Sequence, residues 1–118
     1  MHGHLPIGDD AADILFLYLA GGATTVRGMQ GHPAQLEIRE QIESGDLLGP
    51  RLWLAAPAMS GDSVPDVETA ERLVRAARAD GYDLLQIHEG LAEPVYYAIA
   101  ATAREGGLPG GGHVPEAV

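Results

Sequence analysis

The feature that most constrains the fold is a proline–glycine spacing that occurs three times along the chain. The segments 33–45, 65–81 and 94–106 each begin with a proline and end with a glycine. Proline suits the first turn of a helix, where its missing N–H has no partner to lose, and glycine readily takes the left-handed conformation that ends a helix. The spacing therefore predicts three helices of similar length.

Apolar residues inside two of these segments recur at helical spacing. They form one stripe in each, made of Val67, Ala70, Val74 and Ala77 and of Val95, Ala98, Ile99 and Thr102. A fourth helix is expected to begin after Asp9 and Asp10, which can cap it, and to run to about Ala20. This helix is apolar almost all round, which predicts burial on more than one side.

Strand candidates lie between the helices. They are the first residues around His2–His4 and the segments 23–27, 51–56, 84–87 and 108–114, although three glycines weaken the last on propensity. Alternating β and α units of roughly 25 to 30 residues predict a parallel sheet with right-handed crossovers. Two α/β architectures fit: a five-stranded flavodoxin-like domain, or about five β/α units of a partial (β/α)8 TIM barrel.

Composition excludes several classes of function. The 118 residues carry 17 acidic and 7 basic side chains, a net charge of -10, which argues against nucleic-acid binding. The longest apolar run, 14–20, is too short to span a bilayer, so no membrane partner is expected. Cysteine is absent, which excludes thiolate metal ligands. No signal peptide is visible, so the cytoplasm is the default compartment, with export expected if a longer gene product carries an upstream signal.

Histidines fall at or just past the expected carboxyl ends of the strands, where α/β proteins bind ligands. His2 and His4 are two residues apart, so on a strand both imidazoles point to one face and could bind one metal ion. The alternative is a frayed terminus with two exposed histidines. His32, His88 and His113 occupy the other ends. Imidazole with carboxylate suits zinc and similar divalent metals, which activate water for hydrolysis.

Five motifs, in order along the chain, resemble the N-terminal half of a metal-dependent amidohydrolase barrel, in its imidazolonepropionase-like and prolidase-like branch. They are Met1-His2-Gly3-His4-Leu5, Gly22-Ala23-Thr24-Thr25-Val26-Arg27, Leu48-Gly49-Pro50-Arg51, Asp83 through Leu91, and Gly107-Leu108-Pro109 through Gly112-His113-Val114-Pro115. The resemblance implies that residues 1–118 are strands one to five of such a catalytic domain, in the sheet order 1-2-3-4-5. It also implies a zinc-type cofactor of one or two ions.

By this resemblance His2 and His4 bind the first metal, and His113 belongs to a second or shared position. Gln86 stands where the branch usually has a lysine that is carbamylated to bridge two metals. A neutral amide cannot form a carbamate, so the second ion is in doubt. His88 shares the face of Gln86 and could compensate, or Gln86 could be a loss-of-function change with no new role.

Several residues keep alternative interpretations. Arg27 could bind a substrate carboxylate or form a structural ion pair, and His32 is a further auxiliary candidate. Trp53 is expected to pack in the core or against a helix. The family's sixth-strand histidine and eighth-strand aspartate, a ligand and general base, have no counterpart before Val118, so we expect a fragment that is inactive alone.

The leading functional prediction is hydrolysis of C–N bonds in a small amide, cyclic amide or peptide substrate by metal-activated water. The alternatives are a non-catalytic flavodoxin-like binding or signalling module, and a truncated inactive homologue. The sequence leaves open the substrate, the metal identity, the compartment and whether the chain forms a homo-oligomer.

Overall fold

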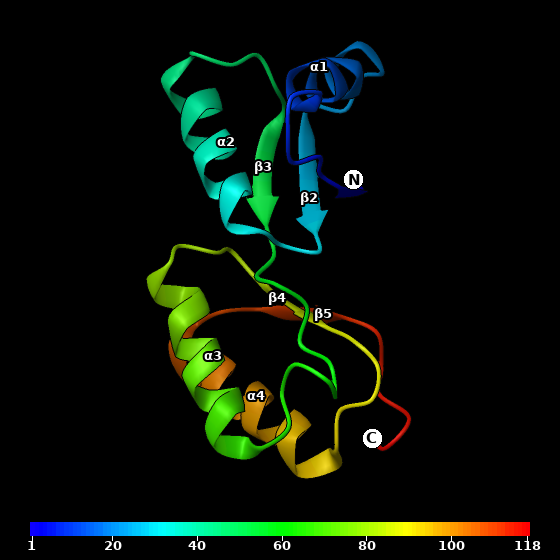
Figure 1. Ribbon diagram of the computed structural model, residues 1–118, viewed down its shortest axis with the longest axis vertical. Coiled ribbons are helices and arrows are strands. Elements are labelled where there is room, and N and C mark those ends of the chain that lie inside the picture. The colour runs from blue at the N-terminus through cyan, green and yellow to red at the C-terminus, as the bar shows by residue number, and fades with distance from the viewer.

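Five parallel strands alternate with four helices, in the order predicted. A computed structural model describes residues 1–118. The elements are β1 (His2–His4), α1 (Ala11–Ala20), β2 (Thr25–Met29), α2 (Pro33–Ser44), β3 (Arg51–Leu54), α3 (Val67–Ala79), β4 (Leu85–Ile87), α4 (Glu93–Gly106) and β5 (Gly110–Gly112). Figure 1 shows α1, α2, β2 and β3 in its upper part, and β4 and β5 with α3 and α4 below.

Strand pairing follows the chain. β2 lies between β1 and β3, and β4 pairs with β5, all in parallel. Two isolated parallel bridges, Ala55 to Leu84 and Met59 to Ile87, link the continuation of β3 to β4. The order 1-2-3-4-5 is therefore confirmed, and the flavodoxin-like alternative is wrong, because that fold places β1 beside β3.

The expected single sheet is not formed, however: β1, β2 and β3 make one sheet and β4 and β5 another, joined by the two isolated bridges. Between the two bridges lies Pro57, which has no backbone N–H to donate. The molecule is also elongated, measuring 43 × 26 × 22 Å, and its radius of gyration of 15.0 Å exceeds the roughly 13.5 Å expected of a compact domain of this length. Both features fit a curved section of a barrel wall.

The helix ends follow the predicted proline–glycine spacing, apart from the start of α3. Gly45 (φ 87°) and Gly107 (φ 66°) take the left-handed conformation after α2 and α4. α3 begins later than predicted, because the Asp66 side chain caps it by accepting from the Thr69 N–H at 2.7 Å, and Pro65 stays outside. Asp10 precedes α1, but its side chain makes no capping hydrogen bond.

Strand boundaries differ more. β2 runs to Met29 instead of stopping at Arg27, because Gly28 and Met29 pair with β1, and Gly28 also pairs with β3. β5 covers only three glycines, fewer than the predicted 108–114. In both places the pairing available from neighbouring strands, and not local propensity, sets the ends.

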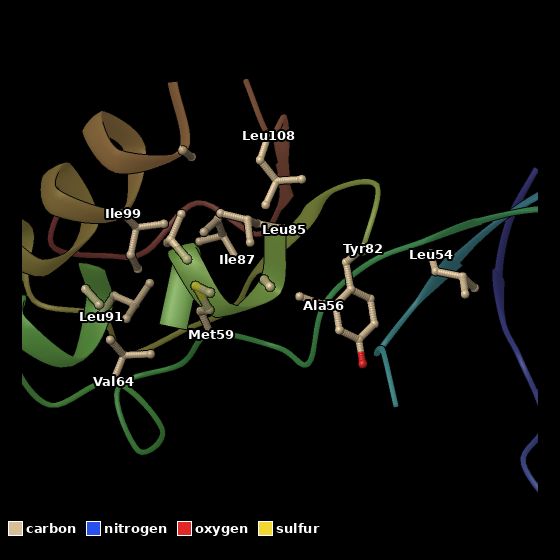
Figure 2. Packing of buried hydrophobic residues seen from close by; sticks show 14 of the residues in the cluster. Leu54, Ala56, Met59, Val64, Tyr82, Leu85, Ile87, Leu91, Ile99 and Leu108 are labelled. Atoms are coloured by element: carbon tan, nitrogen blue, oxygen red, sulfur yellow. The ribbon is translucent and has the colours of Figure 1, made fainter. Parts of the chain in front are cut away.

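One hydrophobic cluster of 19 buried residues joins the sheet to the helices on its covered face. Figure 2 shows Leu85, Ile87 and Ile99 close together in this cluster. Tyr82 belongs to this cluster. Burial raises the pKa of its hydroxyl, and the nearby Asp80 carboxylate adds to the shift.

Two burial predictions are wrong. In α1 only Ala11 and Leu15 are buried, while Phe16 and Leu17 are 52% and 64% exposed, because no element packs on their side. Trp53 is 50% exposed, because strand alternation points its neighbours Leu52 and Leu54 toward the core instead. None of the four helices combines the length and apolar character needed to cross a bilayer.

Candidate functional site

The candidate site lies on the face of the sheet opposite the hydrophobic core. His2 on β1 pairs in register with Arg27 on β2, which pairs with Trp53 on β3. Residues paired in a parallel ladder point the same way, so these three exposed side chains share one face. His4 is two residues from His2 and lies on the same face, as predicted.

His2 and His4 approach each other closely. Their ring centroids are 5.5 Å apart and their Nε2 atoms are 3.4 Å apart. Two nitrogens that both bind a tetrahedral zinc at about 2.0–2.1 Å stand roughly 3.3 to 3.4 Å from each other. The spacing of the two Nε2 atoms therefore fits two ligands of one ion.

His4 is also held from its other ring nitrogen. Its Nδ1 lies 2.8 Å from Oε1 of Gln30, the residue that follows β2. The backbone N–H of Gln30 donates in turn to Oε1 of Gln86 on β4. Gln86 is only 4% exposed, so the position that resembles the family's bridging lysine is a buried amide already engaged with the residue that follows β2.

A second histidine pair lies at the ends of β4 and β5. The rings of His88 and His113 are 4.6 Å apart, inclined by 33°, and His113 Nδ1 lies 3.5 Å from Oε1 of Glu89. Gln86 and His88 are two residues apart, so alternation places them on the same face. His113 follows Gly112, whose φ is 131°, and it lines a pocket with Ile87 on β4 and Ile99 on α4. The observed partner of His88 is thus His113, and compensation for Gln86 by His88 stays a prediction.

The structure does not bring all the predicted ligands together. No group of three His, Asp or Glu side chains is arranged to hold a metal ion. His113 contacts His88 and Glu89, whereas His2 contacts His4. The residues present thus provide half of a tetrahedral site at β1.

The remaining predicted residues have local surroundings. His32 caps α2. Its ring Nδ1 accepts from the Ala34 backbone N–H at 3.2 Å, and the backbone N–H of His32 donates to Gln35 Oε1. Arg27 is exposed and makes no ion pair, so the structure does not support the alternative that Arg27 forms a structural ion pair.

An open polar hollow of about 1040 Å³ lies at the carboxyl ends of β2 and β4. Among its lining residues are Gln30, His88, Asp62, Glu89 and Glu116. Three carboxylates in one hollow favour a neutral or cationic ligand over an anionic one.

Sequence reasoning missed Gln30, which contacts both His4 and Gln86. Gln30 is the one non-glycine residue with a positive φ, 55°. Glycine and asparagine are the residues that signal such a conformation, and glutamine gives no comparable warning. Glu89 follows His88 directly in the sequence, but its contact with His113 depends on how β4 and β5 pair.

Solved structures resemble the chain over most of its length. A bottromycin amidohydrolase matches 99% of this chain with a TM-score of 0.86 and 27% identity. A crystal structure of an uncharacterized protein matches 88% of the chain at a TM-score of 0.77 and 21% identity. A Bifidobacterium longum protein described as a prolidase matches 85% at a TM-score of 0.69 and 22% identity.

These matches cover 27%, 34% and 30% of the three larger chains, so this chain spans about a third of their length or less. The two below 25% identity establish the fold alone. Comparison with protein-family models and with curated protein sequences finds no match. The alternating units and parallel strands match part of the TIM barrel of the bottromycin amidohydrolase, which is the fold that the sequence resemblance implied.

Proposed function

We propose that this chain, which has the fold of part of an amidohydrolase barrel, contributes histidine ligands to metal-dependent hydrolysis of C–N bonds. The observation that carries the proposal is the 3.4 Å spacing of His2 Nε2 and His4 Nε2 on the first strand. That spacing fits two ligands of one ion, and both rings are exposed to an incoming ion.

Zinc bound at this pair would supply the usual chemistry of such sites, acidifying a water and polarising a carbonyl. The chain's own residues have separate tasks. His2 and His4 hold the ion, and His113 with His88 offers a second imidazole pair at the ends of the neighbouring strands.

The proposed substrate is a neutral or cationic amide, cyclic amide or peptide. Asp62, Glu89 and Glu116 line the hollow and disfavour an anionic group there. Arg27 lies on the His2 row and does not line the hollow, so binding a substrate carboxylate would require a second substrate group over β2. A proposed role for Glu89 is to hold the His113 imidazole in place from Nδ1.

A second candidate is a homologue that binds metal without turnover. Gln86 favours it, because a neutral, buried amide occupied by the Gln30 N–H cannot become an anionic bridge between two ions.

Zinc titration by calorimetry tests the proposal on the metal-stripped chain. We expect one ion to bind and His4→Ala to weaken binding by at least about tenfold, since it removes one of two ligands. His32→Asn is the matched control, because it removes an exposed imidazole while asparagine still caps α2.

An assay with N-acyl amino acids, dipeptides and cyclic imides separates the two candidates. Zinc-dependent hydrolysis that His4→Ala abolishes would assign a hydrolase, and zinc binding without hydrolysis would assign a non-catalytic homologue. Zinc affinity equal in wild type and His4→Ala would reject both.

A further inference from the structure

We infer that Gln30 is a positioning residue for His4, holding its imidazole in the tautomer that leaves Nε2 free to bind a metal, and that Gln86 fixes Gln30 for this task. The inference rests on the proposed function for its purpose, but the positioning itself is a property of the metal-free chain.

The first step is the contact at Nδ1. Gln30 Oε1 lies 2.8 Å from His4 Nδ1, and an amide oxygen can only accept a hydrogen bond. His4 Nδ1 must therefore carry the proton. A neutral imidazole protonated at Nδ1 has its lone pair at Nε2, the atom that faces His2 Nε2 at 3.4 Å. The partner of one ring nitrogen thus prepares the other as a ligand.

The second step is the backbone of Gln30. Its φ of 55° lies in the left-handed region, which side chains other than glycine and asparagine rarely adopt. The Gln30 N–H donates to Oε1 of Gln86, whose side chain is almost fully buried. This hydrogen bond ties the turn after β2 to β4 and so holds the Gln30 side chain over β1.

The third step concerns the residue type at position 86. Glutamine offers an oxygen that accepts from the Gln30 N–H, whereas a lysine ammonium only donates. Glutamine in place of the family's lysine therefore has two consequences. Its amide cannot form a carbamate, and its oxygen can fix Gln30. Two strands separate β1 from β4, and Gln86 acts on the His2–His4 pair through one intervening residue, Gln30.

The test uses three variants of the chain. Gln30→Gly removes the amide and suits the left-handed backbone, so it should fold without loss of stability. Gln30→Glu keeps an oxygen acceptor for His4 Nδ1. Gln86→Met keeps the volume of the buried side chain and removes the acceptor. Gln41→Ala, an exposed glutamine on α2, is the matched control.

The first readout is the ¹⁵N NMR spectrum of the imidazoles in the metal-free chain, at a pH where they are neutral. We expect wild-type His4 to be protonated at Nδ1, with Gln30→Gly shifting it toward the Nε2-protonated tautomer that dominates for free imidazoles. Gln30→Glu should restore the wild-type signature, and Gln86→Met should shift it in the direction of Gln30→Gly.

The second readout is zinc affinity. Removing an outer-shell partner commonly weakens metal binding about 10- to 100-fold, and we expect that loss in Gln30→Gly with rescue in Gln30→Glu. A His4 tautomer and zinc affinity that are both unchanged in Gln30→Gly would overturn the inference while leaving the proposed function intact. If zinc fails to bind the wild type but the tautomer still depends on Gln30, the proposed function fails and the positioning role stands.

Discussion

Arg39 on α2 and Asp83, just before β4, form an ion pair with 2.9 Å between Nη1 and Oδ2. The same Asp83 oxygen accepts from the Leu54 N–H at 2.7 Å, and Arg39 Nη2 donates to the Gly81 carbonyl. These contacts join α2 and β3, in the upper part of Figure 1, to the segment that leads into β4 in its lower part. Asp83 thus satisfies a β3 N–H beside the first bridge that links the continuation of β3 to β4.

Asp83→Ala should destabilise the fold by about 2 to 3 kcal/mol, because it removes two hydrogen bonds to a charged acceptor from partly buried donors. Asp83→Asn should cost less, since its amide oxygen can still accept from Leu54. Urea unfolding measures both. The control is Glu71→Gln: Glu71 and Arg75 are also 3.0 Å apart but exposed, so this change should cost only about 0.3 to 0.5 kcal/mol. Equal losses in Asp83→Ala and Glu71→Gln would refute the bridging role.

Gly31→Ala should destabilise the chain by at least about 1 to 3 kcal/mol through overpacking. A Cβ at Gly31 would run into the backbone carbonyl of Ala55, which belongs to a different strand connection and cannot move away as a flexible side chain could. Gly110→Ala is the matched control, because a Cβ there meets nothing within 4 Å. Thermal unfolding should separate the two variants clearly, and a Gly31→Ala chain as stable as Gly110→Ala would contradict the packing seen here.

The order of elements was predictable because it depends on local chemistry. Proline and glycine mark helix ends wherever they occur, and β/α units connected in this way leave few topologies. Burial was less predictable. Alternation assigns Trp53 and Leu54 to opposite faces, but which face is covered depends on helices elsewhere in the chain. The same holds for Phe16, whose apolar side chain is exposed although the helix is apolar.

The candidate site likewise has a part that the sequence predicts and a part that only the structure shows. The His2–His4 pair follows from the two-residue period of a strand, so the sequence alone could place both rings on one face. The meeting of His88 with His113 depends on the register of β4 against β5. The contacts of Gln30 could be found only from the structure, because nothing in the sequence marks a glutamine with a left-handed backbone conformation.

Asp66 should make the stability of the fold depend on pH at the acidic end. Hydrogen bonds from the Thr69 backbone and hydroxyl, with a smaller contribution from the Arg72 charge, lower the pKa of Asp66 below 3.8. Because the pKa of Asp66 is lower in the folded state than in the unfolded state, its carboxylate stabilises the fold fully above pH 3.8. This stabilisation is lost as the pH falls further, through the pKa of the folded state. Asp66→Asn keeps a capping side chain without a titrating group, so its stability difference from wild type should shrink below that pH. A difference that stays constant from about pH 7 to about pH 2 would contradict this assignment.

The last prediction concerns metal stoichiometry. The chain should bind no more than one zinc ion. Only two imidazole nitrogens, those of His2 and His4, stand at the spacing of two zinc ligands, and no third His, Asp or Glu joins them. Closed structural zinc sites use four protein ligands and catalytic sites usually three, so a two-residue site should bind weakly and fix the geometry poorly.

Gln86 removes the route to a second ion, because its neutral amide is engaged by the Gln30 N–H. Bicarbonate, the source of a lysine carbamate, should therefore leave the stoichiometry unchanged. Calorimetric titration with zinc in the presence and absence of bicarbonate measures this, and equilibrium dialysis with metal analysis provides an independent count. His113→Ala should leave the single site in place, since His113 contacts His88 and Glu89 and not His2. Two ions per chain, or loss of the single site in His113→Ala, would mean that the two histidine pairs act as one metal centre.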